Sequence, residues 1–270
     1  MTTTHPTTRP GAPPSGPAQT VSPARLAWLH LRFQFLETVR IPMAVIGNAL
    51  FPALAMAFFV VPQAEVAGNP AFATMAVAGL AMFGVCSASL FTYGLGVAED
   101  RALPFDPFVR SLPAGPMPRM VARVGNGAIF ALFGLVPLIV VAWLFTDAAV
   151  TASELAVGIG MILLTSVPFV LLGMGIGYSL TAKAALPIVQ VILFPLAFAG
   201  GLFLPPMMFP AWLDTLSQAT PTRAGRDLMV EALTGIEANP WAWPVLIGWT
   251  LVFGALAAWA YRRDEGRRFR

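Results

Sequence analysis

The sequence predicts an all-α integral membrane protein with six transmembrane helices, preceded by a helix at the cytoplasmic interface. Apolar residues make up 57% of the 270 residues, charged residues make up only 11%, and the mean hydropathy is strongly positive. A soluble domain carries about 25% charged residues, so this composition excludes an ordinary soluble protein. The chain also contains six stretches without a charge, each long enough to cross a hydrocarbon core of about 30 Å.

The N-terminal part contains no predicted span. Residues 1–23 are rich in Thr, Pro, Ala and Gly and lack the apolar stretch of a signal peptide, so we expect a disordered cytoplasmic tail. Residues 24–40 are predicted to form a helix at the membrane interface, with Arg25 and Arg32 extending toward the lipid head groups. A short soluble linker helix is the alternative for this segment.

The membrane domain is predicted to cover residues 24–262 as one unit, without an attached soluble domain. Its six spans are expected at about residues 41–62, 71–98, 123–146, 155–182, 184–204 and 243–261. In this interpretation, residues 205–235 form an extracytoplasmic re-entrant or helical segment. Residues 263–270 form a basic cytoplasmic tail.

The positive charges predict the orientation of the spans. If the N-terminus is cytoplasmic, 14 of the 16 Lys and Arg residues fall on the cytoplasmic side, and only Arg223 and Arg226 fall outside. This bias follows the positive-inside rule, so we expect both termini in the cytoplasm. The high Ala content and the preference for Arg over Lys suggest a bacterial source. We therefore expect a multi-pass protein of the bacterial cytoplasmic membrane.

The fifth apolar stretch is interrupted near its extracytoplasmic end. No charge occurs from Ala184 to Leu213, but glycines and then prolines break the pattern. Glycine gives the backbone freedom and proline enforces a turn, so we interpret this segment as an outer gate or hinge. Its candidate residues are Gly200, Gly201, Phe203, Pro205, Pro206, Pro210 and Trp212.

A short helix is predicted after this break, from about Thr222 to Leu233, with Gly235 as its stop. Arg223 and Asp227 are four residues apart and can form a pair on one face. We expect these charges to lie on a solvated face and not in a substrate site.

The spans offer few groups for ion coupling or catalysis. Their charge-free stretches, of which the third begins at Val124, contain no Asp, Glu, Lys, Arg or His, which ion-coupled carriers and membrane-embedded enzymes usually need. The glycines of residues 173–177 are not followed by the Gly-Lys-Ser/Thr of a nucleotide loop. Asn48 and Gln190 are the most polar side chains in the spans, and hydrogen bonding between helices is their favoured role. Cys86 stands alone and both histidines precede the first span, so neither a disulfide framework nor a metal site in the membrane is expected.

The predicted cytoplasmic loop at about residues 98–123 is the largest on that side. Its segment FDPFVRSLP mixes apolar and charged residues, which suits docking into a groove of a soluble partner. The alternative is a solvated loop whose arginines only determine the topology.

Several short segments, taken in order, carry a resemblance to a known family. Arg110-Ser-Leu-Pro113 precedes span three, and Gly201-Leu-Phe-Leu-Pro205, Pro210-Ala-Trp-Leu213 and Thr220-Pro221 follow the core of span five. This order resembles the membrane subunits of ABC-2 type exporters, the group that includes the daunorubicin-type drug export permeases. One departure is Glu99-Asp-Arg-Ala-Leu-Pro104, which lacks the Gly-Thr that follows the acidic residues in the family.

The resemblance covers residues 24–270 and implies an ABC-2, type V exporter-like fold. It implies a separate soluble ATPase, in two copies per complex, which binds ATP and Mg. This chain would then be no enzyme and would bind no cofactor itself. The resemblance also implies a second membrane subunit, identical or related, within the lipid bilayer, and no nucleic acid.

The resemblance also assigns candidate sites. The interfacial helix and the loop would transmit ATP-driven closure, through Glu99, Asp100, Arg101, Phe105, Phe108, Arg110, Leu112 and Pro113. Candidates for a pathway between spans two and five are Asn48, Phe83, Phe91, Gln190, Phe194 and Phe198. The implied function is export of a lipophilic or amphipathic substrate, such as a drug-like compound or a lipid. Alternatives are export of a polysaccharide or glycolipid, a non-catalytic scaffold, and, least favoured, an enzyme acting on lipids or peptides.

Overall fold

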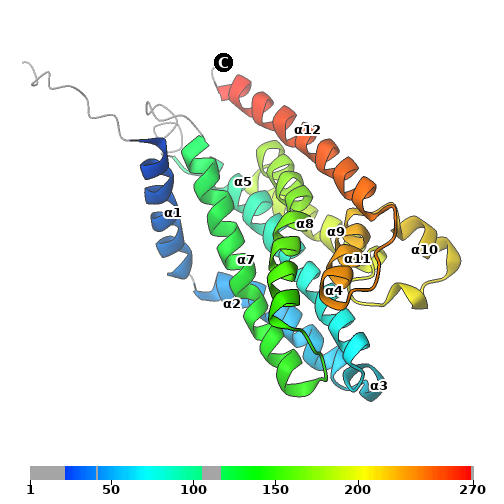
Figure 1. Cartoon of the computed structure of the whole chain (residues 1–270). Coiled ribbons are helices and arrows are strands. Elements are labelled where there is room, and N and C mark those ends of the chain that lie inside the picture. The colour runs from blue at the N-terminus through cyan, green and yellow to red at the C-terminus, as the bar shows by residue number, and fades with distance from the viewer. Residues whose placement is uncertain (1–21, 41, 105–116, 269–270) are drawn as a thin grey trace, which may run out of the picture.

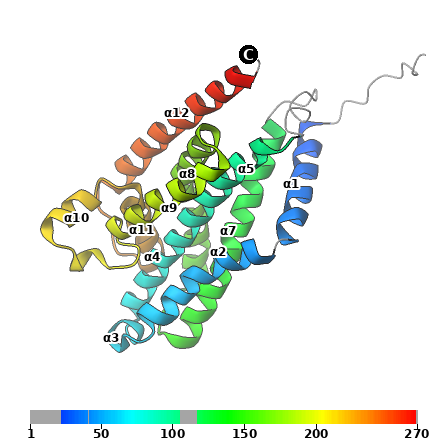
Figure 2. The same cartoon turned by 180° about the vertical axis from the view of Figure 1, so that it is seen from behind.

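The computed structural model describes residues 22–40, 42–104 and 117–268, and within these ranges it leaves out the side chains of residues 42–48 and 266–268. The described chain is a bundle of helices (Figures 1 and 2). Its elements are α1 (Pro23–Val39), α2 (Pro42–Ala55), the π-helix η1 (Met56–Val60), α3 (Ala64–Ala67), α4 (Pro70–Ser89), the π-helix η2 (Leu90–Leu95), α5 (Gly96–Ala102), α7 (Met117–Phe145), α8 (Ala152–Ser179), α9 (Ala182–Ala199), the 3-10 helix η3 (Pro206–Met208), α10 (Ala211–Ser217), α11 (Pro221–Thr234) and α12 (Ala242–Arg268).

Five of these helical stretches are long and apolar enough to cross a membrane. They are Pro70–Ala102, Met117–Phe145, Ala152–Ser179, Ala182–Ala199 and Ala242–Glu265. The stretch Ala49–Val60, within the first predicted span, is a shorter apolar helix. An all-helical membrane protein is therefore confirmed, whereas the residues whose side chains are described include no sixth helix of membrane length.

Local sequence determines where several helices begin and end. Asn69 precedes Pro70, and its side chain accepts hydrogen bonds from the first backbone N–H groups of α4. Thr151 and Glu154 form a capping box at the start of α8. Gly235 ends α11 in the left-handed conformation, with φ of 70°, as the sequence predicted.

The continuous helix α4–η2–α5 is the centre of the bundle. In its most apolar window 78% of the residues are buried, against 33% or less for the other four membrane-length helices. One part of it packs with α2, α7 and α11 through residues such as Leu135 and Met229. Another part packs with α8 and α9 through residues such as Phe169 and Val189. This central helix therefore contacts α2, α7, α8, α9 and α11.

The π-helix η2 brings Tyr93 across to α7. The Tyr93 hydroxyl donates to the carbonyl oxygens of Arg123 and Val124, both at 3.3 Å. A Cβ atom on Gly127 would lie 2.1 Å from the Tyr93 hydroxyl, so only glycine fits there. Gly177 of α8 is equally constrained, because its Cβ would lie 2.4 Å from the Tyr93 carbonyl oxygen. Gly173 and Gly177 of α8 therefore allow close packing against the central helix.

Helix α1 packs along the first half of α7. The rings of Phe35 and Phe130 lie 5.4 Å apart, and Asn126 donates to the Thr38 hydroxyl at 3.2 Å. No residue of α1 is buried. The start of α1 and the end of α12 lie at the same end of the bundle (Figure 1). This arrangement agrees with termini on one side of a membrane.

Candidate functional site

The predicted break in the fifth span is a sharp end of α9. This helix ends at Ala199, earlier than the expected residue 204, and Gly201 adopts φ of +72°. A Cβ on Gly201 would also lie 2.7 Å from Pro206. At Gly200 a Cβ would lie 2.2 Å from the Thr222 hydroxyl. Glycine is needed at both positions, at Gly201 for the left-handed turn and at Gly200 for the close approach of α11.

Neutral hydrogen bonds join the chain beyond the break to α9 and α12. The Thr222 hydroxyl donates to the Leu196 carbonyl oxygen at 2.7 Å, which joins the start of α11 to the last turn of α9. The Trp249 indole donates to the Ala219 carbonyl oxygen at 2.8 Å, which joins α12 to the turn before α11. Of the predicted gate residues, Pro206 is buried and Trp212 is exposed.

Five phenylalanines meet beside this break, and we call them the phenylalanine cluster: Phe51, Phe83, Phe194, Phe198 and Phe203. Phe83 of α4 is buried and lies at the centre, with its ring 4.7 Å from Phe203 and 5.2 Å from Phe51. The Phe198 and Phe203 rings are 5.0 Å apart. Phe51, Phe194 and Phe198 are exposed, so the cluster forms an apolar wall open on one side.

The structure therefore brings together four predicted residues, three of the pathway and one of the gate, and adds Phe51. The sequence places Phe51 in the first span, but no local signal indicates that it faces Phe83. Phe91 makes no ring contact with the cluster among the described residues. It packs against buried residues of the central helix, α8 and α9. Gln190 is exposed on α9, and the Asn48 side chain lies outside the described residues.

The charges of α10 and α11 contradict the expected solvated face. Arg223 donates to Asp227 at 2.8 Å and to Asp214 at 3.1 Å, and Arg226 donates to Asp227 at 3.0 Å. Arg226 is only 7% exposed. Burial lowers the pKa of Arg226, although the neighbouring Asp227 opposes that shift. An arginine nevertheless keeps its charge under such conditions.

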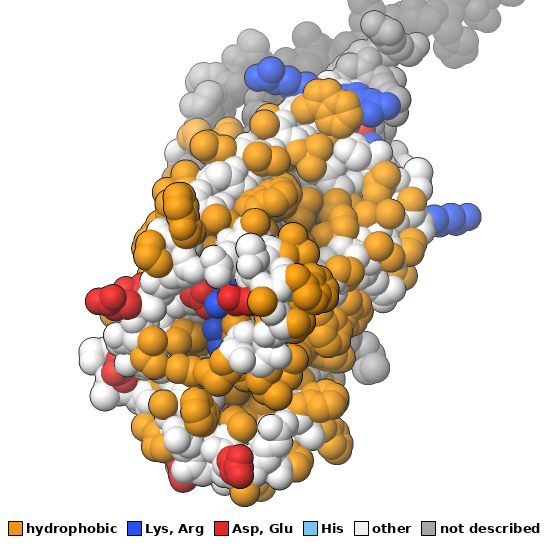
Figure 3. Space-filling model, turned by 90° about the vertical axis from the view of Figure 1, so that its right-hand side faces the viewer, with side chains coloured by type: hydrophobic (Ala, Val, Ile, Leu, Met, Phe, Trp, Pro, Cys, Tyr) orange, Lys and Arg blue, Asp and Glu red, His pale blue; other side chains and the backbone are white. Residues whose placement is uncertain are grey.

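The reason for this burial is the position of α11 within the bundle. Gly225 lies so close to α4 that a Cβ there would be 2.7 Å from the Met82 side chain, and Leu228 is fully buried. Figure 3 shows acidic and basic side chains together in a recess of a largely apolar face, on the side of the molecule that carries α10 and α11. The predicted helix is thus a packed element and not a surface helix.

The first residues of the predicted coupling loop are held by ion pairs within the chain. Asp100 pairs with Arg123 at the start of α7. Arg101 pairs with Asp264 of α12 and donates to the carbonyl oxygens of Gly177 at 2.7 Å and Leu180 at 3.1 Å. We call this second set the Arg101 clasp. It joins the ends of α5, α8 and α12.

The remaining coupling residues divide into two groups. Glu99 is exposed, and its side chain is accessible to a partner. Five others lie outside the described residues: Phe105, Phe108, Arg110, Leu112 and Pro113. The sequence did not indicate the partner of Arg101, because Asp264 lies 163 residues further along the chain.

Comparison with known proteins decides the family. The model of the ABC-2 type transporter family matches residues 25–234 of the chain. The chain belongs to the ABC-2 type transporter family. It is also similar to the "Putative transport permease YvfS" of Bacillus subtilis (strain 168), with 22% identity over 186 residues, which are 69% of this chain and 76% of that protein. The resemblance inferred from the motifs is thereby confirmed, and the chain is a membrane-embedded ABC transporter permease subunit.

Proposed function

We propose that this permease subunit exports a lipophilic or amphipathic compound, either drug-like or a lipid, from the cytoplasm or the inner leaflet. A separate ATPase, in two copies, supplies the energy and binds ATP and Mg. Two membrane subunits, identical or related, enclose the pathway. Each subunit crosses the membrane six times, with α2–η1 as the first span and both termini in the cytoplasm.

The phenylalanine cluster is the observation that carries the substrate class. Its five rings present apolar surface and no hydrogen-bonding group, which suits an apolar or amphipathic molecule. A polysaccharide needs hydrogen-bond partners along its path, so the cluster favours the lipophilic cargo over the glycan alternative. The cluster adjoins the end of α9, which supports an outer gate at Gly200 and Gly201.

The ion pairs at the other end of the bundle support a coupling role for the loop between α5 and α7. In sequence, the loop begins just after Asp100 and Arg101, which are bonded to α7, α8 and α12. A displacement of this loop by an ATPase would therefore act on three spans at once. In this proposal, Asp100 and Arg101 position the helices, and Glu99 and the loop contact the ATPase.

The test is ATP-dependent efflux of a lipophilic fluorescent dye from proteoliposomes that contain this chain and its ATPase. We expect efflux with the active ATPase and none with an ATPase whose catalytic carboxylate is replaced. Phe198→Ala should lower efflux about tenfold at unchanged assembly, since it removes an exposed ring of the cluster. Phe58→Ala is the matched control, because Phe58 is similarly exposed and makes no ring contact with the cluster among the described residues.

Two results would contradict the proposal. Equal efflux by the two phenylalanine variants would remove the cluster from the pathway. Absence of ATP-dependent efflux of any apolar or amphipathic probe, with a stable complex, would favour the scaffold alternative.

A further inference from the structure

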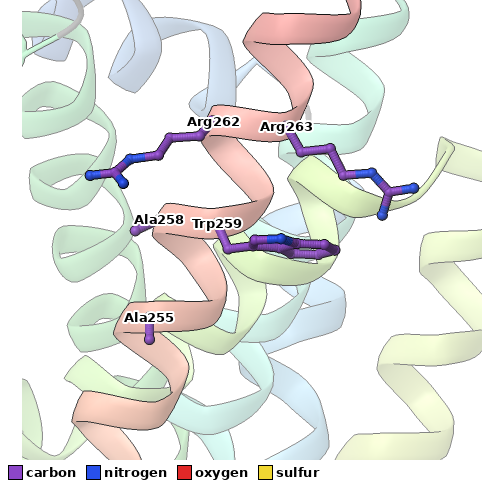
Figure 4. Close-up of a pocket in the computed structure, with 5 residues that line it drawn as sticks. All are labelled: Ala255, Ala258, Trp259, Arg262 and Arg263. Atoms are coloured by element: carbon purple, nitrogen blue, oxygen red, sulfur yellow. The ribbon is translucent and has the colours of Figure 1, made fainter.

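The outer face of α12 carries a hollow at its last turns before the C-terminus. The hollow measures about 510 Å³ and is lined by Ala255, Ala258, Trp259, Arg262 and Arg263 (Figure 4). These positions recur every three or four residues and so lie along one stripe of the helix. The opposite stripe, which includes Ala257, Ala260 and Asp264, is buried against the bundle.

The two arginines on this face carry positive charge at the surface of α12. Both are exposed, and neither makes an ion pair within the described residues. Asp264 follows Arg263 directly but is turned inward to Arg101, and its side chain is 4% exposed. Glu265 is exposed and is not paired with either arginine in the described part of the chain. The Arg101 clasp therefore fixes the rotation of α12 such that two positive charges face outward.

The remaining groups match the parts of a phospholipid. The Arg263 guanidinium lies 5.1 Å from the centroid of the Trp259 ring, so the indole holds this arginine near the membrane interface. Figure 4 shows Arg262 and Arg263 extending to different sides of the helix, with Ala255 and Ala258 on the turns before them. The two small side chains leave a shallow depression in an apolar helix face, where an acyl chain can lie.

We propose that this hollow binds an anionic phospholipid of the cytoplasmic leaflet. The Arg262 and Arg263 side chains, which extend to different sides of the lipid-free helix, turn toward the phosphate when the lipid binds, and an acyl chain follows Ala255 and Ala258 beside Trp259. An anionic head group is favoured over a zwitterionic one because no carboxylate of the described residues forms an ion pair with either arginine. The proposal requires α12 to face lipid, and it does not depend on which cargo the transporter exports.

The test measures lipid binding to the full-length chain in detergent by native mass spectrometry. The probes are phosphatidylglycerol, phosphatidylcholine and glycerol phosphate. We expect the wild type to retain phosphatidylglycerol over phosphatidylcholine, and we expect Arg262→Gln/Arg263→Gln to weaken phosphatidylglycerol binding about thirtyfold. Ala258→Leu should fill the depression and weaken both lipids. Glycerol phosphate should not compete at millimolar concentration.

The matched control is Arg25→Gln/Arg32→Gln, which removes two exposed arginines from α1. It should change phosphatidylglycerol binding by less than about threefold. An equal loss of phosphatidylglycerol binding in the two double variants would overturn the site, because the lipid would then bind to any exposed positive charge. Saturation of the hollow by glycerol phosphate, or equal retention of both lipids by the wild type, would overturn the lipid assignment. Since the readout is binding alone, failure of the export proposal would leave these results unaffected.

Discussion

The elements around helix α9 are held together in different ways near its two ends. Near its start, the Arg101 clasp joins α5, α8 and α12 through a largely buried ion pair and two hydrogen bonds to carbonyl oxygens. At its end, one neutral hydrogen bond from Thr222 and the close contact at Gly200 hold it to α11. Breaking a buried charged pair leaves a charge without its partner, whereas losing a neutral hydrogen bond costs about 1 kcal/mol.

This difference indicates which end of the bundle separates more easily. Beyond the break, one ion pair joins α10 to α11 and two lie within α11, and within the described residues none of them reaches α9. Separation there would fall between α9 and α11 and would leave all ion pairs intact. The end of the bundle that carries the Arg101 clasp would then transmit a displacement of the helices, and the end at the contact between α9 and α11 would open.

The largest expected effect is the loss of the Arg101 clasp. Arg101→Met removes the ion pair with Asp264, whose side chain is 4% exposed, and the hydrogen bonds to the last carbonyl oxygens of α8. We expect the folded state to lose about 3 kcal/mol, since breaking a buried ion pair by removing one member is strongly destabilising. Thermal unfolding of the purified chain measures this loss.

Two further variants complete this test. Arg25→Met removes an exposed arginine and should leave the melting temperature unchanged. Arg101→Met/Asp264→Leu should recover part of the loss, because neither charge then remains. An unchanged melting temperature for Arg101→Met would show that the clasp does not hold this end.

The second effect concerns the turn at the other end of α9. Gly201→Ala places a Cβ at φ of +72° and 2.7 Å from Pro206, so we expect a loss of about 2 kcal/mol and impaired export. Melting temperature and dye efflux together measure the change. Gly248→Ala is the control, because a Cβ at Gly248 meets no atom within 4 Å. Efflux at the wild-type rate from the Gly201 variant would show that this turn has no role in opening the pathway.

Composition and periodicity were sufficient to predict most helices of this protein. The all-helical membrane fold, the break near Gly200 and the stop at Gly235 follow from apolar length and from the conformations that glycine alone adopts. These features depend on neighbouring residues and can be inferred locally. The length of the first span could not be settled in this way, since its described apolar part is only Ala49–Val60.

The contacts that define the candidate sites could not be predicted in the same way. Phe51 meets Phe83, and Arg101 meets Asp264, only because separate helices pack together. The burial of Arg226 could likewise not be predicted from the sequence, because the pattern of α11 resembles that of a surface helix with an i,i+4 ion pair. Its position between α4, α8 and α12 determines its environment, and that position is a tertiary property.

The smallest effect on stability concerns the single hydrogen bond between α9 and α11. Thr222→Val keeps the shape of the side chain and removes the donor to the Leu196 carbonyl oxygen, 2.7 Å away. That oxygen also accepts from the Gly200 N–H at 2.8 Å, so it remains partly satisfied. We therefore expect a loss of only about 1 kcal/mol.

The same substitution should have a larger effect on the closed gate. If α9 and α11 separate during export, the weakened contact favours the open form and raises dye leakage without ATP by roughly fivefold, which is the factor that 1 kcal/mol gives in a two-state equilibrium. Thr250→Val is the matched control, since the Thr250 hydroxyl donates to Leu246 within its own helix. Equal leakage from both variants would show that the end of α9 stays closed against α11, and the contrast between the two ends of this helix would then have no functional meaning.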